Sequence, residues 1–185
     1  MFLVRHGESE FNQAFRKTGR DPGIVDPPLT PLGIQQIQQT ADFFCDKDIQ
    51  FCVSSPYQRA LQTSAVLFDL TNRNLTVNFL VGEQFGFSCD VGSPRSELEK
   101  KWPQVDFENL TEVWWPSEPE TENAVGRRGA LFLKETSNQL LNTDKLVVVS
   151  HWGFIKSLTG LSVDNGSVVE FREDISNCVV YQPPL

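Results

Sequence analysis

Two short apolar runs, each leading to a histidine, constrain the fold more than any other feature of the sequence. Residues 2–4 (Phe-Leu-Val) lead directly into residues 5–8 (Arg-His-Gly-Glu), and the run 146–150 ends at His151. The chain has two histidines in all. Such runs predict buried strands, and ligand sites in open α/β sheets lie at the carboxyl ends of strands. We therefore expect both histidines at one sheet edge, with His6 as a candidate nucleophile.

Composition narrows the class of protein. The 185 residues are 39% hydrophobic and 22% charged, which suits a single domain over residues 1–185. The net charge of −8 argues against nucleic-acid and anionic-membrane surfaces. No apolar run approaches the roughly 20 residues of a membrane span, and a strand begins at the first residues, so we expect a cytoplasmic protein without a signal peptide. The cysteines are scattered without a CxxC pair, which predicts reduced thiols and no metal site: Cys45, Cys52, Cys89 and Cys178.

The order of predicted elements indicates an α/β fold with a largely parallel sheet covered on both faces. Thr30 as N-cap and Pro31 at the first helical position mark one helix start. The expected strands span 2–5, 51–54, 76–80, 145–150, 167–172 and 177–181. The expected helices are a turn near 9–16, a helix from Pro31 with an apolar stripe reaching Phe44, and helices over 57–70, 95–101, 120–141 and 153–159. The stretch 84–119 is otherwise irregular and is expected to form a lid or substrate region.

Four segments, in order along the chain, carry a recognisable set of motifs. They are Arg5-His6-Gly7-Glu8-Ser9 with Asn12; Asp26 with Leu29-Thr30-Pro31-Leu32-Gly33 and Gln36; residues 54–63, which contain Arg59-Ala60; and Val148-Val149-Ser150-His151 with Gly153. Together they resemble the signature of the histidine phosphatase superfamily, in the branch that includes cofactor-dependent phosphoglycerate mutases and related phosphatases. The resemblance implies a three-layer α/β/α sandwich with a mostly parallel mixed sheet.

The resemblance also implies roles for the motif residues. His6 would carry the phosphoryl group, because a neutral imidazole is a nucleophile at working pH and later a good leaving group. Arg5 and Arg59 would flank the phosphoryl oxygens with planar guanidinium groups, and their charge would keep His6 unprotonated. His151 would donate to a transferring oxygen. No metal or organic cofactor is expected.

Further residues are expected around the substrate. Glu83 would protonate the leaving oxygen and later activate water, although Glu8 and Glu10 are alternative carboxylates near the site. Asn12 would donate to the phosphate or act as a helix-capping residue. Thr18 and Gly19 would contact substrate.

A second phosphatase motif competes with the first. Cys89 and Arg95-Ser96 have the C-x5-R-S spacing of cysteine-dependent phosphatases. However, Asp90 would place an anion against a phosphate there, and Pro94 removes a backbone donor. We therefore interpret this stretch as part of a lid, in which Arg95 could help to recognise substrate.

Departures from the family pattern bear on the reaction. Trp152 stands where the family usually has glycine, and it would line the pocket or stack on substrate. Residues 82–87 lack the basic residues found around the acid in mutases, and the chain is shorter than a typical mutase, which favours a phosphatase. Trp114-Trp115 would form either core packing or a pocket wall. Arg127 and Arg128 are expected on a solvated helix face, with a reach into the site as the alternative.

The sequence thus predicts a phosphomonoesterase that works through phospho-His6. Its partner would be a small phosphorylated substrate or a phosphoprotein. The alternatives are a phosphotransferase of the phosphoglycerate mutase type and a catalytically idle member that binds phosphorylated ligands. The sequence leaves the physiological substrate and the oligomeric state open.

Overall fold

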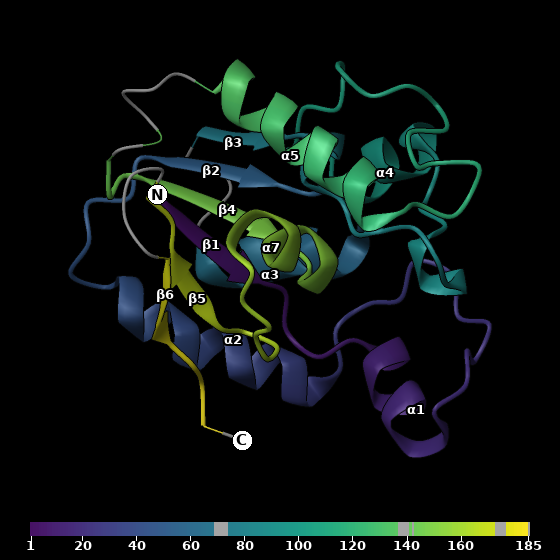
Figure 1. Cartoon of the computed structure of the whole chain (residues 1–185), viewed down its shortest axis with the longest axis horizontal. Coiled ribbons are helices and arrows are strands. Elements are labelled where there is room, and N and C mark those ends of the chain that lie inside the picture. Colours follow the sequence, from purple (N-terminus) through teal and green to yellow (C-terminus); the bar gives the residue numbers. More distant parts are fainter. Residues whose placement is uncertain (69–73, 137–140, 142, 173–176, 185) are drawn as a thin grey trace.

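A mixed six-stranded sheet lies at the centre of the computed structural model, which describes residues 1–68, 74–136, 141, 143–172 and 177–184 (Figure 1). The strand order is β3-β2-β4-β1-β5-β6. The four strands β3, β2, β4 and β1 pair in parallel. At one edge of the sheet, β5 pairs antiparallel with β1, and β6 pairs antiparallel with β5. The strands are β1 (Phe2–Arg5), β2 (Phe51–Ser54), β3 (Asn74–Val77), β4 (Leu146–Ser150), β5 (Val168–Glu170) and β6 (Cys178–Tyr181).

Helices cover both faces of this sheet. The α-helices are α1 (Glu10–Thr18), α2 (Pro31–Phe44), α3 (Gln58–Leu67), α4 (Arg95–Lys101), α5 (Glu122–Glu135) and α7 (Trp152–Thr159), and the 3₁₀ helices are η1 (Phe79–Val81) and η2 (Ser88–Asp90). One core cluster joins α2 and α3 to the sheet, and another joins α5 and α7 to it. The predicted α/β/α sandwich with a mostly parallel sheet is therefore confirmed. Figure 1 shows α1 and α4 beyond the carboxyl ends of the parallel strands.

Alternating side chains along the central strands divide between the two cores. Phe2 and Val4 of β1 belong to the cluster with α2 and α3, whereas Leu3 belongs to the cluster with α5 and α7. All five residues of β4 are buried. Full burial of one large aliphatic side chain contributes about 1.5–3 kcal/mol, so these strands are firmly held. A rigid central pair of strands is what positions the residues that follow them.

The loop after β1 is fixed by a close backbone approach to α2. The Thr30 hydroxyl caps α2 by accepting from Gly33 N at 3.0 Å, and Thr30 N donates to Glu8 O at 2.9 Å. A Cβ atom on Gly33 would lie 2.1 Å from Glu8 O, and one on Gly7 would lie 2.5 Å from Gly33 O. Both positions therefore require glycine, and the loop that carries His6 is packed directly on the first turn of α2.

Two predicted elements differ from the structure in kind or in where they end, and the strand expected over 167–172 is shortened to Val168–Glu170. The strand expected over 76–80 ends at Val77, because the Asn78 side chain accepts from Leu80 N at 2.9 Å and begins η1 instead. The turn expected near 9–16 is the complete helix α1. Its N-terminus is a capping box in which Ser9 and Asn12 each accept a hydrogen bond from the other's backbone N–H. Both changes come from polar side chains that bond to nearby backbone.

Two predicted helices are shorter than expected. The helix expected over 57–70 ends at Leu67, and the helix expected over 120–141 ends at Glu135. Residues 69–70 and 137–140 of those predictions lie outside the described residues. Within the part of the chain that the structure describes, no helix is both long enough and apolar enough to cross a membrane.

We predict that Gly33→Ala lowers the free energy of unfolding by more than about 2 kcal/mol, because backbone atoms of the 7–8 loop cannot yield to the new methyl group. Urea denaturation measures this change. Gly86→Ala is the control, since a Cβ there would meet no atom within 4 Å. An equal loss in the two variants would contradict the close-packing account.

Candidate active site

His6 and His151 meet at the carboxyl edge of the sheet. His6 follows β1 and His151 follows β4, and these strands pair in parallel with Arg5 opposite Ser150. The His6 backbone N donates to Ser150 O at 3.0 Å. The two imidazole rings lie 5.1 Å apart between centroids. The strand pairing therefore brings together two histidines that are far apart in the sequence.

The His6 ring is oriented by its own chain. Its Nδ1 lies 2.7 Å from Gly7 O, so Nδ1–H donates to that carbonyl and Nε2 is left for other chemistry. Gly166 N and the Asn165 side chain both donate to the His6 carbonyl. Burial, followed by the positive charges of Arg59 and Arg5, holds the pKa of His6 well below its ordinary value. His6 is consequently a neutral imidazole with one free nitrogen.

Arg59 enters the site from the first turn of α3. Asp26 caps this helix, since its Oδ1 accepts from Gln58 N at 2.9 Å. The Arg59 side chain is almost completely buried and stacks over the Tyr57 ring at 4.4 Å. Its Nη1 donates to Cys89 O at 2.7 Å, which leaves other guanidinium N–H groups available. Arg59 is thus held rigidly on the pocket side of the helix.

Arg5 supplies a second cation from the end of β1. Its Nη1 donates to Val163 O at 2.6 Å. Its Nε is buried and has no hydrogen-bond partner among the described residues. A buried guanidinium N–H without a partner is costly, and an anion beside His6 would satisfy it. This geometry favours a phosphoryl group between Arg5 and Arg59.

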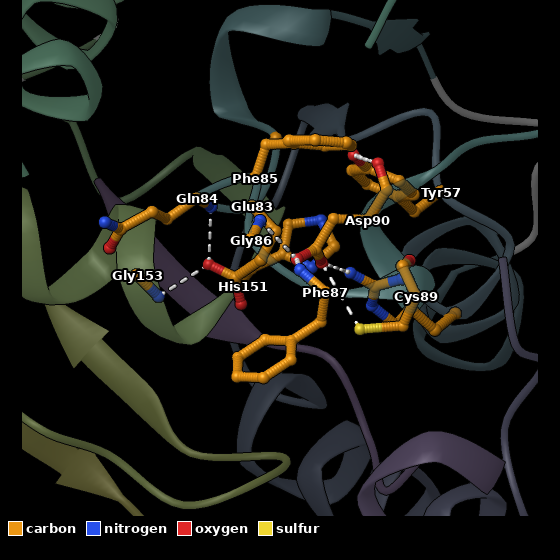
Figure 2. A network of polar contacts seen from close by, with 12 residues as sticks. Tyr57, Glu83, Gln84, Phe85, Gly86, Phe87, Cys89, Asp90, His151 and Gly153 are labelled. Carbon is orange, nitrogen blue, oxygen red and sulfur yellow. Dashed lines mark hydrogen bonds and ion pairs between the residues drawn. The ribbon is translucent and has the colours of Figure 1, made fainter. Parts of the chain in front are cut away.

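Glu83 reaches the site from the segment after η1. Its Oε1 accepts from Gln84 N and from Gly153 N, both at 2.8 Å, and Figure 2 shows the two bonds converging on this oxygen. Burial and then the negative charge of Asp90 raise the pKa of Glu83. A carboxyl group that stays protonated above its usual pH range can act as a general acid.

Arg128 positions the segment that carries Glu83. Its guanidinium donates to the carbonyls of Leu80, Gly82 and Glu83 at 2.6, 3.3 and 3.0 Å. It also forms an ion pair with Glu120 at 2.8 Å. The expectation that Arg128 lies on a solvated helix face was wrong, because its side chain is bonded to these carbonyls and to Glu120. The sequence could not show this, since the carbonyls lie far from Arg128 in the chain. Arg127, in contrast, is exposed and lies outside the pocket beside His6.

Asp90 is a site residue that the sequence did not identify as functional. Its Oδ1 forms a buried ion pair with Arg59 at 3.3 Å. Its Oδ2 accepts from Gly86 N at 3.1 Å and Phe87 N at 3.0 Å, as Figure 2 illustrates. The Asp90 charge contributes to the raised pKa of Glu83. The sequence drew attention to Asp90 only as a residue within the C-x5-R-S motif, where its charge argued against a phosphate loop.

His151 lies behind the pocket wall. It is completely buried, contacts His6 and Tyr57 ring to ring, and is absent from the pocket lining among the described residues. Its Nε2 lies 2.7 Å from the Ser55 hydroxyl, and its Nδ1 is buried without a partner in the described chain. Burial, and then the charge of Arg59, keep the pKa of His151 well below its ordinary value. Nδ1 is therefore the ring nitrogen without a partner in the described chain, and its donation to a transferring oxygen stays a prediction, because His151 does not line the pocket.

A pocket of about 460 Å³ gives access to these groups. A larger hollow of about 600 Å³ between α5 and α7 contains neither histidine, so the smaller pocket is the candidate active site. Asn12 and Trp152, both predicted to bind substrate, line it, whereas Thr18 and Gly19 are exposed and do not. The lining residues are Arg5, His6, Ser9, Phe11, Asn12, Phe15, Arg59, Glu83, Gln84, Phe85, Gly86, Phe87, Cys89, Asp90, Pro119, Glu120 and Trp152.

Asn12 and the alternative carboxylates differ in what they offer the pocket. The Asn12 Oδ1 accepts from Ser9 and Asn165, so its amide nitrogen is left to face a ligand. Glu8 is committed to Thr30 at 2.8 Å and Arg16 at 2.7 Å and lies outside the lining. Glu10 is exposed on α1. Glu83 is therefore favoured over Glu8 and Glu10 as the acid.

The cysteine motif does not form a phosphate loop. Cys89 lines the pocket, but burial raises the pKa of its thiol far above the usual range, which disfavours a thiolate. Arg95 donates to Leu110 O and pairs with Glu99, and Ser96 bonds to Glu112, so neither faces Cys89. Several residues of the 84–119 stretch do line the pocket, in keeping with a lid.

The tryptophan pair belongs mainly to the core. Trp114 is buried in a cluster with Tyr57 and donates to Ser93 O at 2.9 Å. Trp114 and Trp115 line a separate cavity of about 190 Å³, which shares Glu83 with the lining of the candidate active site. The core-packing interpretation is therefore the one that the geometry favours.

Comparison with known proteins identifies the family. A model of the histidine phosphatase superfamily (branch 1) matches residues 1–182. The chain belongs to this superfamily. It is 27% identical over 180 residues to the putative phosphoserine phosphatase 2 of Hydrogenobacter thermophilus, covering 89% of this chain and 81% of the relative. It is also 26% identical over 198 residues to the 2,3-bisphosphoglycerate-dependent phosphoglycerate mutase of Nautilia profundicola, covering 88% and 85%.

A solved structure supports the same fold. The mycobacterial glucosyl-3-phosphoglycerate phosphatase superposes with a TM-score of 0.64 at 20% identity, covering 99% of this chain and 98% of the other. Both phosphatases and mutases thus stand among the relatives of this chain.

We predict that Gly153→Ala lowers kcat by about tenfold to a hundredfold, because displacement of a reacting group by about 1 Å has effects of this size. A Cβ at this position would lie 2.5 Å from Glu83 Oε1 and would displace the carboxyl group. Gly126→Ala is the matched helical control, since its Cβ would meet Ser157 Oγ at an ordinary 3.4 Å. Steady-state kinetics checks the pair, and equal kcat values in both variants would contradict the assigned position of Glu83.

Proposed function

We propose that this histidine phosphatase hydrolyses phosphomonoesters through a phosphohistidine intermediate on His6. The observation that carries the proposal is the neutral His6 ring, bonded through Nδ1 to Gly7 O and flanked by the buried Arg59 and the half-buried Arg5. Mutases share this chemistry, but their second phosphoryl transfer needs a bound phosphorylated acceptor. The phosphatase is favoured because residues 82–87, around Glu83, carry none of the basic side chains that surround the acid in mutases.

The first step transfers the phosphoryl group to the enzyme. Nε2 of His6 attacks phosphorus, and the bond from phosphorus to the ester oxygen breaks. The leaving oxygen takes the proton of Glu83, whose raised pKa keeps that proton available. Arg5 and Arg59 stabilise the equatorial oxygens with N–H donors that are already in place.

The second step returns the enzyme to its starting state. Glu83, now a carboxylate, removes a proton from water, and the resulting nucleophile attacks the phosphorus of phospho-His6. The bond between phosphorus and Nε2 breaks, and inorganic phosphate leaves. Asn12 and Nδ1 of His151 would donate to phosphoryl oxygens in both steps, with the Ser55 contact holding the His151 ring.

We predict that His6→Ala lowers turnover of p-nitrophenyl phosphate in EDTA by at least about a thousandfold, because the nucleophile is lost. Cys89→Ser is the control and should retain activity. Loss with Cys89→Ser but not with His6→Ala would overturn the histidine mechanism. Absence of wild-type turnover across several phosphomonoesters would favour a phospho-ligand-binding protein, and efficient transfer between 3-phosphoglycerate and bisphosphoglycerate would favour a mutase.

The pH dependence of kcat/KM follows from the two pKa shifts. His6 must be neutral to attack, and its lowered pKa keeps it neutral below pH 6.5, its ordinary value. Glu83 must be protonated to act as acid, and its raised pKa extends activity above 4.5, its ordinary value. We therefore predict an acidic optimum whose alkaline limb is lost in Glu83→Gln. A pH profile of both proteins on one substrate checks this, because substrate ionisation is then common to both; an unchanged limb in the variant would contradict it.

A further inference from the structure

The outer wall of the pocket is aromatic, and the proposed chemistry does not use it. Phe11 and Phe15 of α1 stack at 5.5 Å with an interplanar angle of 15°, and Phe87 contacts both rings at 5.7 and 5.5 Å. We call these three residues the phenylalanine clamp. Phe85 and Trp152 add further apolar surface to the same pocket. The clamp therefore offers an apolar surface in the same pocket as His6.

Phe87 is exposed and yet held in place. Its side chain is 47% exposed. Its backbone N donates to Asp90, and both the backbone N and the hydroxyl of Ser88 bond to Asp21 at 2.8 and 2.5 Å. Covering an exposed phenyl ring removes apolar surface from water, which favours binding of the ligand. The entropic cost of binding is smaller when the ring is already held in place. These bonds hold the backbone at Phe87, and the contacts with Phe11 and Phe15 support its ring on one side.

The charges that line the pocket disfavour an anionic leaving group. Among the described residues, the lysine and arginine side chains that line the pocket are those of Arg5 and Arg59. The proposed mechanism uses both for the phosphoryl group. Three carboxyl residues also line it: Glu83, Asp90 and Glu120. A second carboxylate or phosphate on the substrate would be desolvated without a cation of its own and would face these groups.

We propose that the leaving group of the substrate is uncharged and carries a flat aromatic ring, which binds against the phenylalanine clamp. This inference rests on the proposed function, because it takes the space beside His6 as the phosphoryl site. The pocket volume of about 460 Å³ leaves room for such a ring beside a phosphoryl group. Phosphorylated carboxylic acids such as 3-phosphoglycerate and phosphoserine are consequently poor substrates.

The test compares substrates that differ in the remote group but share an alkyl leaving oxygen. We expect kcat/KM for 2-phenylethyl phosphate to exceed that for ethyl phosphate by about tenfold or more, from burial of the phenyl ring. We expect 3-phosphoglycerate and phosphoserine to fall below ethyl phosphate. Equal values for the phenyl and ethyl esters, or a preference for either acid, would overturn the inference.

Two exposed phenylalanines provide a matched pair of variants. Phe87→Ala should reduce the ratio of kcat/KM between 2-phenylethyl and ethyl phosphate severalfold. Phe79→Ala removes a ring that is 44% exposed and lies outside this pocket, so it should leave the ratio unchanged. An equal change of the ratio in both variants would assign the effect to general destabilisation and overturn the role of the clamp.

Binding of phosphonates separates this inference from the proposed function. Isothermal titration of the wild type with 2-phenylethylphosphonate and ethylphosphonate needs no turnover. A preference for the phenyl compound without hydrolysis of any ester would refute the phosphatase and retain the clamp. Hydrolysis without a phenyl preference in either assay would retain the phosphatase and refute the clamp.

Discussion

The parallel pairing of β1 with β4 is the constraint on which the rest of the site depends. It sets Arg5 opposite Ser150, so that His6 and His151, the next residues, face one another at the sheet edge. Side chains that alternate along both strands anchor this pair in two separate cores. The close contact between Gly7 and Gly33 holds the loop after β1 against α2 at the same edge. Asp26 caps α3 and so places Arg59 there as well. The reactive groups are thus positioned by backbone before any ligand binds.

Opposed charges give the site its division of roles. The arginines that would bind phosphate also lower the pKa of His6, whereas Asp90 pairs with Arg59 and raises the pKa of Glu83. A neutral nucleophile, His6, and a protonated acid, Glu83, can then coexist in one pocket at mildly acidic pH. Arg128 completes this arrangement from outside, because it holds the carbonyls of the segment that carries Glu83.

Local sequence signals predicted much of the fold and part of the site. The sequence predicted the strands before His6 and His151 and the helix start at Thr30-Pro31. These features depend on residues that are neighbours in the chain, such as an apolar run or a capping side chain. The end of β3 was missed because a single side chain, Asn78, decides it. The role of Asp90 was missed because its charged partner, Arg59, lies in a distant segment. For Arg128 the sequence offered a reach toward the site only as an alternative, because the carbonyls that it binds also lie far away in the chain. The exposed positions of Thr18 and Gly19 likewise follow from how the loop after α1 folds, which no motif specifies.

The most direct test of the account is to trap the phosphoryl group on the enzyme. The Glu83→Gln variant, mixed with p-nitrophenyl phosphate and quenched in alkali, should accumulate a covalent phosphoryl group, because p-nitrophenolate leaves without a proton from the acid, whereas hydrolysis of the intermediate still needs the missing base. Peptide mass spectrometry should locate the group on His6, with the stability in alkali and lability in acid that distinguish phosphohistidine. A phosphoryl group on Cys89, or turnover by the wild type with no phosphorylated enzyme in either protein, would contradict the account.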